Sequence, residues 1–84
     1  MIWTVLYLPS ADDRLTNIWI ESDNREAVTA AANFIDSQLG DNALTAGESR
    51  EANKRMIIKA PLAAHFYVIP DVMKVVVFHV QEWK

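Results

Sequence analysis

Between residues 11 and 39, apolar side chains recur every three or four positions in two separate segments, a pattern typical of amphipathic helices. The first segment predicts a helix from about Ala11 to Glu21. The second predicts a helix that begins after a capping box of Asp23 and Glu26 and stops at Gly40, where glycine allows a left-handed turn. The two apolar stripes are Ala11, Leu15, Ile18 and Trp19, and then Val28, Ala31, Ala32, Ile35 and Leu39.

Four segments are instead rich in β-branched and aromatic residues and predict strands. They are Ile2–Leu8, Arg55–Ala60, Ala63–Ile69 and Lys74–Trp83. The turns at Pro61-Leu62 and Pro70-Asp71 are so short that the last three strands must form two consecutive hairpins. Residues 41–53 read as a long loop, and its length indicates a working or partner-facing role.

These elements predict an α+β fold in one domain that covers residues 1–84. Its order is β-α-α-β-β-β: an N-terminal strand, a two-helix hairpin packed on one face of the sheet, and a three-stranded antiparallel meander. The last strand carries apolar side chains on both faces, and two helices can cover only one. Either loop 41–53 folds over the second face, or that face binds another chain.

Composition narrows the class of protein. The chain has 84 residues and no cysteine, which excludes a disulfide framework and zinc sites built on thiolates. The apolar runs are too short to span a bilayer and no export signal is evident, so we expect a cytoplasmic protein. His65 and His79 lie on different predicted strands, with no carboxylate at ligand spacing from either. We therefore predict no metal and no cofactor.

The net charge of −3 argues against indiscriminate binding of nucleic acids. The charge is uneven, because residues 1–47 carry about −5 and residues 48–84 about +2. The one concentration of positive charge comprises Arg50, Lys54, Arg55 and Lys59. These side chains either hold phosphates or another anionic partner, or form an ordinary solvated loop and edge.

Particular residues along nearly the whole chain resemble the RelE/ParE superfamily, the toxins of type II toxin–antitoxin modules of the plasmid-stabilisation type. The resemblance lies in Trp19–Glu21, Ala27–Ala32 with Ile35, Asp36 and Leu39, Gly47–Arg50, Arg55, Pro61-Leu62, Phe66–Val68, and Val75, Val77, Phe78 and Val80. It implies a curved antiparallel sheet with a helical hairpin, and an antitoxin partner whose extended segment wraps the toxin. RelE-like members cut mRNA in the ribosomal A site, and ParE-like members poison DNA gyrase.

The resemblance also implies site residues. Cleaving members use basic side chains on the concave sheet face and an acid or base near the end of the last strand. Arg55 falls where such a lysine sits, and His79 or Trp83 is the terminal group. However, Ile57 and Ala64 stand where further positive charge is expected, which argues against ribonuclease activity of the usual kind.

The resemblance thus assigns Arg55 and His79 to catalysis, with His79 on the face of Val75 and Val77. The alternative for His79 is a histidine at the sheet edge, bonded to backbone or water. Target, phosphate or antitoxin contacts fall to Arg50, Lys54, Arg55, Lys59 and Trp83.

Two functions follow from these assignments. The first is a toxin that binds a translation or gyrase target, on the ribosome and its mRNA or on DNA gyrase. The alternative is a non-catalytic interaction domain of the same fold, which acts through homodimerisation or partner binding on its apolar sheet face. An independent small enzyme lacks support, because no nucleophile–base pair or phosphate loop is evident.

Overall fold

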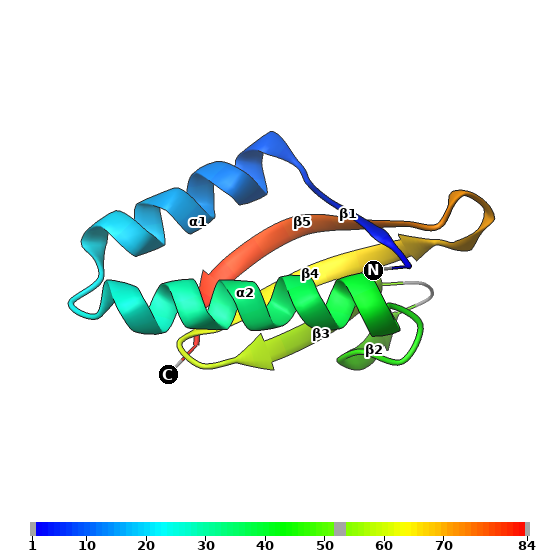
Figure 1. The fold of residues 1–84 in the computed structure, drawn as a ribbon. Helices are drawn as coiled ribbons and strands as arrows, with labels where there is room; N and C mark the ends of the chain where they lie inside the picture. Colours follow the sequence, from blue (N-terminus) through cyan, green and yellow to red (C-terminus); the bar gives the residue numbers. More distant parts are fainter. Residues whose placement is uncertain (1, 52–53, 84) are drawn as a thin grey trace.

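One twisted sheet and one layer of two helices make up the protein (Figure 1). The structure is a computed structural model that describes residues 2–51 and 54–83, with side chains described for all of these except residues 49–51. The elements in chain order are β1 (Thr4–Tyr7), α1 (Pro9–Glu21), α2 (Arg25–Asn42), β2 (Glu48–Glu51), β3 (Lys54–Lys59), β4 (Leu62–Ile69), a 3-10 turn η1 (Pro70–Val72) and β5 (Lys74–Glu82).

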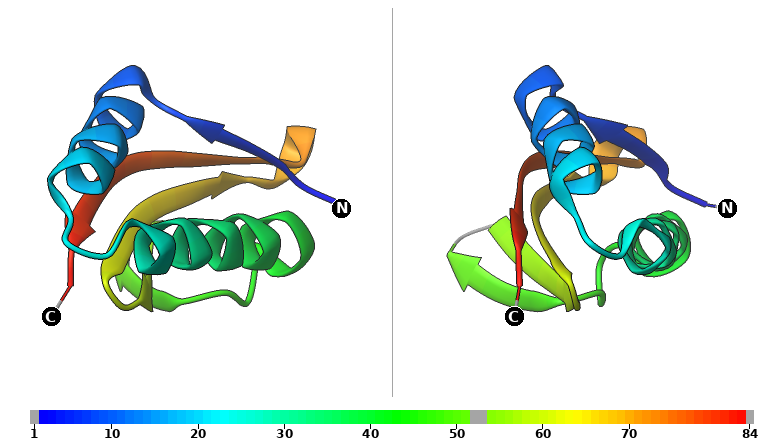
Figure 2. Two further views of the ribbon diagram at one scale, coloured as in Figure 1. Left: turned by 60° about the vertical axis from the view of Figure 1, so that its left-hand side comes forward. Right: turned by 90° about the vertical axis from the view of Figure 1, so that its left-hand side faces the viewer.

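The strand order within these described ranges is β1-β5-β4-β3-β2. The last three long strands form the two expected antiparallel hairpins, and β1 pairs in parallel with β5. Both helices lie on the same side of the sheet (Figure 2). The predicted α+β order, with the helices on one face, is therefore confirmed, and β2 is an additional short strand at the sheet edge.

Local chemistry explains where the helices begin. Pro9 occupies the first turn of α1, where a missing N–H costs nothing, so α1 starts two residues before the predicted position. α2 is capped by Asn24, whose side-chain oxygen accepts a hydrogen bond from the Ala27 N–H at 3.1 Å. No helix in the described ranges is long and apolar enough to cross a membrane.

The end of α2 differs from the prediction. The helix passes through Gly40 and continues to Asn42, so Gly40 is not its stop. Gly40 is buried, and its carbonyl oxygen accepts hydrogen bonds from the backbone N–H groups of Ile2 and Trp3, each at 2.9 Å. This glycine therefore marks the place where the N-terminus packs against α2.

The hydrophobic core lies between the helices and one face of the sheet. Strand alternation places Phe66 and Val77, which are direct partners on β4 and β5, on this face with no exposed surface. The helices contribute the stripes that the sequence predicts, except that Trp19 is 41% exposed instead of buried. The largest fully buried side chains are Phe66, Ile35, Leu39, Leu62, Val28, Val75, Val77 and Val80.

The described part of segment 41–53 does not cover the other face of the sheet. Ala43 and Ala46 are buried in the core on the helix side, and Glu48–Glu51 then forms β2 beside β3. Gly47 makes the sharp turn between them with a φ of 68°, and a Cβ there would lie 2.3 Å from the Met56 carbonyl oxygen. The interpretation of this segment as a loop folded over the second face is therefore wrong.

Candidate functional site

The sheet face away from the helices is the candidate site. Directly paired residues share a face, and the partners Phe66 and Val77 point into the core. Their neighbours Tyr67 and Val76 therefore point away from the helices, as does Lys54, which pairs with Tyr67. We call this surface the open face.

Five side chains form a cluster on the open face. The rings of Tyr67 and Phe78 stack at 5.9 Å between centroids, and the Lys54 ammonium lies 5.8 Å from the Phe78 centroid. The His65 ring lies 6.0 Å from Phe78 and 5.4 Å from His79. Lys54, His65, Tyr67, Phe78 and His79 are hereafter the aromatic cluster.

A β-bulge brings His79 into this cluster. Phe66 pairs with Val77 and His65 with His79, so Phe78 is an extra residue without a direct partner. In such a bulge two side chains of one strand oppose a single residue of the other. His79 consequently contacts His65 on the open face, and the prediction that it shares the face of Val75 and Val77 is wrong.

Arg55 lies on the opposite side of the sheet. It pairs with the core residue Phe66, and its Nε and Nη2 donate hydrogen bonds to the carbonyl oxygens of Ala46 at 2.9 Å and Gly47 at 3.2 Å. The guanidinium thus satisfies the backbone of the turn before β2. Arg55 therefore does not lie on the open face, and its predicted contact with a target stays a prediction.

Replacing Arg55 with alanine should lower the free energy of unfolding by about 1–2 kcal/mol, because two hydrogen bonds from a charged group are lost. Urea denaturation followed by circular dichroism measures the loss. The control is Lys54→Ala, an exposed neighbour on the other face, which should stay within about 0.5 kcal/mol. An unchanged stability with a lost biological effect would show that Arg55 contacts a target instead.

The two positions where the resemblance led us to expect further positive charge also lie on the helix side of the sheet. Ile57 and Ala64 pair with each other and are both buried in the core on the helix side. Their apolar character is required by the core and carries no information about the open face. The argument against ribonuclease activity that rests on these two residues therefore falls.

Two further predicted site residues, Lys59 and Trp83, do not join the cluster. Lys59 lies on the helix side, where its ammonium is 5.0 Å from the Phe34 ring of α2. Trp83 follows the far end of β5, where its backbone N–H donates to the Pro61 carbonyl oxygen at 2.9 Å. The side chain of Arg50 lies outside the described residues. Of the five predicted residues whose side chains the structure describes, it brings Lys54 and His79 together in the cluster.

Stacked rings beside a lysine suit the recognition of flat or anionic groups. Aromatic side chains stack on exposed nucleobases, and a lysine neutralises a phosphate as a point charge. His65 and His79 add imidazole groups, the side chains that most often act as general acids and bases in enzymes. Within the described ranges, no three His, Asp or Glu side chains gather as metal ligands would.

A second polar feature lies on the helix side of the molecule. The Tyr7 hydroxyl of β1 donates a hydrogen bond of 2.6 Å to Asp36 Oδ1 of α2. Burial of the phenol, this hydrogen bond, and the negative charges of Asp36 and Asp12 all raise the pKa of Tyr7 well above its ordinary value. The hydroxyl therefore stays protonated and ties the first strand to the second helix.

Tyr7 should make stability fall at alkaline pH. Its folded-state pKa is raised, so the stabilisation is complete below the unfolded-state pKa of about 10 and is lost as pH rises above it. The unfolding free energy of the native chain should therefore fall faster than that of Tyr7→Phe above about pH 10, by up to about 1.4 kcal/mol per pH unit. Urea titrations at several pH values measure the unfolding free energy of the native chain and of Tyr7→Phe. If both fall with pH at the same slope, the raised pKa of Tyr7 is contradicted.

Comparison with known proteins reveals similarity in structure alone. No protein-family profile and no curated protein sequence matches the chain. A chain of the RelBE2 toxin–antitoxin complex of Mycobacterium tuberculosis superposes with a TM-score of 0.76 at 19% identity, covering 98% of this chain and 92% of that one.

Two further structures agree. A chain of the chromosomal ParDE toxin–antitoxin system of P. aeruginosa gives a TM-score of 0.74 at 15% identity, with 99% and 98% coverage. The isolated E. coli RelE toxin gives 0.65 at 16% identity, with 98% and 85% coverage. The resemblance to RelE and ParE toxins is thus confirmed at the level of the fold.

Proposed function

We propose that the chain is the toxin component of a type II toxin–antitoxin module and that its open face binds the cellular target. The observation that carries the proposal is the aromatic cluster, in which two half-buried stacked rings lie beside an exposed lysine, on a fold that toxin structures share. Function resides in such sites and not in the fold itself, so the cluster is the part to test.

The composition of the cluster favours binding over cleavage. It contains two imidazoles for proton transfer but one lysine to neutralise phosphate charge. Each positioned acid–base group contributes about 10²–10⁴-fold to a rate, and stabilisation of transition-state charge is usually a larger contribution. The target is either the ribosome with its mRNA or DNA gyrase, and the stacked rings favour exposed bases on mRNA.

The proposed partner is a cognate antitoxin. Two of the similar structures are toxin–antitoxin systems, one of them the RelBE2 complex. A cytoplasmic location follows from this proposal, since the ribosome and gyrase act there.

A second candidate function is homodimerisation through the open face. Leu6, which pairs with Val76, is 43% exposed, and Ile58 and Ile69 are each 37% exposed. Together with the cluster they form an apolar strip that a second copy would cover. Sedimentation over a range of concentrations separates this candidate from the first.

Regulated expression in bacteria tests the leading proposal. We expect induction to arrest growth, and we expect co-expression of the neighbouring gene to relieve the arrest. Primer extension on mRNA and supercoiling assays with gyrase then identify the target. Unimpaired growth with full expression of folded protein would overturn the proposal.

A further inference from the structure

Three side chains on the open face lie in one row across β3, β4 and β5. Met56 pairs directly with His65, and His65 pairs directly with His79. Direct partners of an antiparallel sheet share a face, and their Cβ atoms lie about 4.5–5.5 Å apart. The thioether of Met56 and the two imidazoles are therefore neighbours in space, although they come from three strands. We call these three side chains the Met-His-His row.

The two histidines lie on different strands, which is the reason why the sequence predicts no metal. The register of β4 and β5 removes this reason, because it makes His65 and His79 direct partners beside the bulge. Their ring centroids are 5.4 Å apart, and the ring planes meet at 51°.

This separation suits two imidazoles that bind one metal ion. First-row metal ions bind an imidazole nitrogen at about 2.0–2.1 Å, so the ion lies about 3.2 Å from the ring centroid. Two rings around one ion then have centroids about 5.2–5.5 Å apart, for angles between tetrahedral and trigonal. The observed 5.4 Å between His65 and His79 lies within this range. Rotation of the side chains can therefore bring both rings to one ion while the strands stay in place.

Met56 adds a third donor atom to the pair. Its side chain is 6% exposed, and it lies outside the core cluster between the sheet and the helices. The thioether is thus buried on the open face beside His65, where little water competes for an ion. The methionine side chain has three rotatable bonds and can reach an ion held by its neighbour. His79 is exposed and leaves the row accessible from solvent.

The set of donors selects the metal. Thioethers are soft ligands that favour Cu(I), and imidazole also suits copper. In the part of the chain that the structure describes, no third histidine or carboxylate joins the two histidines as a metal ligand. The ammonium of Lys54, 5.8 Å from the Phe78 centroid, repels a divalent ion more strongly than a monovalent one. An uncharged set of one thioether and two imidazoles is therefore best suited to a soft, singly charged ion.

We propose that the Met-His-His row, Met56, His65 and His79, binds one Cu(I) ion on the open face. Each imidazole ligates through one nitrogen and keeps the other for a hydrogen bond, which orients the ring. Phe78 lies 6.0 Å from the His65 ring and stacks with Tyr67, so aromatic rings shield one side of the site.

The consequence for target binding rests on the proposed function, but copper binding does not. A bound ion occupies His65 and His79 of the aromatic cluster, so it should compete with a target on the same face. The binding itself can be measured whether or not the chain is toxic.

The test titrates the whole chain, without oxygen, with Cu(I) held by bicinchoninate, a chelator whose copper complex loses its colour when the protein takes the ion. We expect the chain to take one ion. His79→Gln, at an exposed position where a substitution should leave the fold intact, should abolish uptake in this competition. Zn²⁺, titrated by calorimetry, should bind at least about 100-fold more weakly than Cu(I).

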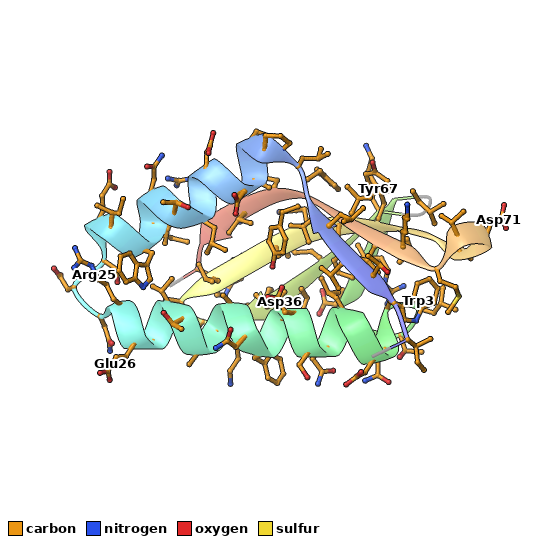
Figure 3. The ribbon with its side chains drawn as sticks, turned by 45° about the horizontal axis from the view of Figure 1, so that its top comes forward. Trp3, Arg25, Glu26, Asp36, Tyr67 and Asp71 are labelled. Atoms are coloured by element: carbon orange, nitrogen blue, oxygen red, sulfur yellow. The ribbon has the colours of Figure 1, made fainter. Side chains whose placement is uncertain are left out.

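Two methionine variants separate the site from a general affinity for sulfur. Met56→Leu conserves volume and should weaken Cu(I) binding about tenfold, which corresponds to about 1.4 kcal/mol. Met73→Leu removes a thioether that is 40% exposed and should leave binding unchanged. Met73 follows the turn that carries Asp71, at the tip of the β4–β5 hairpin (Figure 3). From there β5 runs about 20 Å to His79, too far for a shared ion.

Silver locates the bound ion. Ag(I) is diamagnetic, carries the same charge as Cu(I) and shares its preference for soft ligands. It should shift the Met56 methyl resonance and the imidazole resonances of both histidines in NMR spectra, and leave the Met73 methyl resonance in place. Circular dichroism confirms that each variant is folded.

Several results would overturn the proposal. They are no uptake of Cu(I) from the chelator, an unchanged affinity in Met56→Leu, equal losses in the two methionine variants, zinc bound as tightly as Cu(I), or one ion for every two chains, which would place the metal between copies. Absence of growth arrest with intact copper binding would instead contradict the proposed function and leave the copper site standing.

Discussion

Replacing Phe66 with alanine should lower the free energy of unfolding by about 3–5 kcal/mol, the largest stability effect we expect from one substitution. The side chain is fully buried between β4 and the helices. Its removal takes apolar area out of contact and leaves a cavity that neighbouring strands cannot close. A domain of 84 residues has a total stability of about 4–13 kcal/mol, so much of it would be lost.

Urea denaturation followed by far-ultraviolet circular dichroism measures this effect. The matched control is Phe34→Ala, which removes the same ring from a position that is 40% exposed on α2. It should cost about 1 kcal/mol or less, mainly through the contact with Lys59. Equal losses for the two variants would mean that the core is not centred on Phe66.

The sequence predicts the elements well wherever one periodicity is sustained. Val28, Ile35 and Leu39 repeat at helical spacing and are buried, and both hairpins follow from turns too short for any other connection. Glycine is harder to interpret. Gly40 looked like a helix stop but lies inside α2, whereas the left-handed glycine is Gly47. Either position could accept a turn, and only tertiary packing selects one.

The candidate site was less predictable because it depends on which face each side chain takes. A single extra residue in β5 reverses the alternation, so that His79 and Phe78 both lie on the open face. The bulge does leave a signal in the sequence, because the spacing of the buried residues Val75, Val77 and Val80 changes from two positions to three. That change in spacing could have predicted the face of His79. Lys54 and Arg55 are neighbours on β3 and therefore point to opposite faces of the sheet. Nothing comparable in the sequence indicates which of the two faces the helices.

Replacing Lys54 with glutamate should abolish the proposed growth arrest. The ammonium of Lys54 is the positive charge of the aromatic cluster, and reversal of its charge would place a carboxylate where an anionic target is expected to bind. Loss of one hydrogen bond to a charged group typically costs about 1.5–3 kcal/mol, which is roughly a 10- to 100-fold loss of affinity. Colony counts after induction, at matched levels of folded protein, measure the effect.

The chain itself supplies the control for this charge reversal. Lys59 is the last residue of β3, at the opposite end from Lys54. Its ammonium also lies over a phenyl ring, 5.0 Å from Phe34, whereas that of Lys54 lies 5.8 Å from Phe78. The two lysines differ in face, because Lys59 lies on the helix side. Lys59→Glu changes the net charge equally and should leave growth arrest intact if the open face binds the target. Equal loss of toxicity in both variants would mean that overall charge governs the effect, and loss in Lys59→Glu alone would move the target site to the helix side.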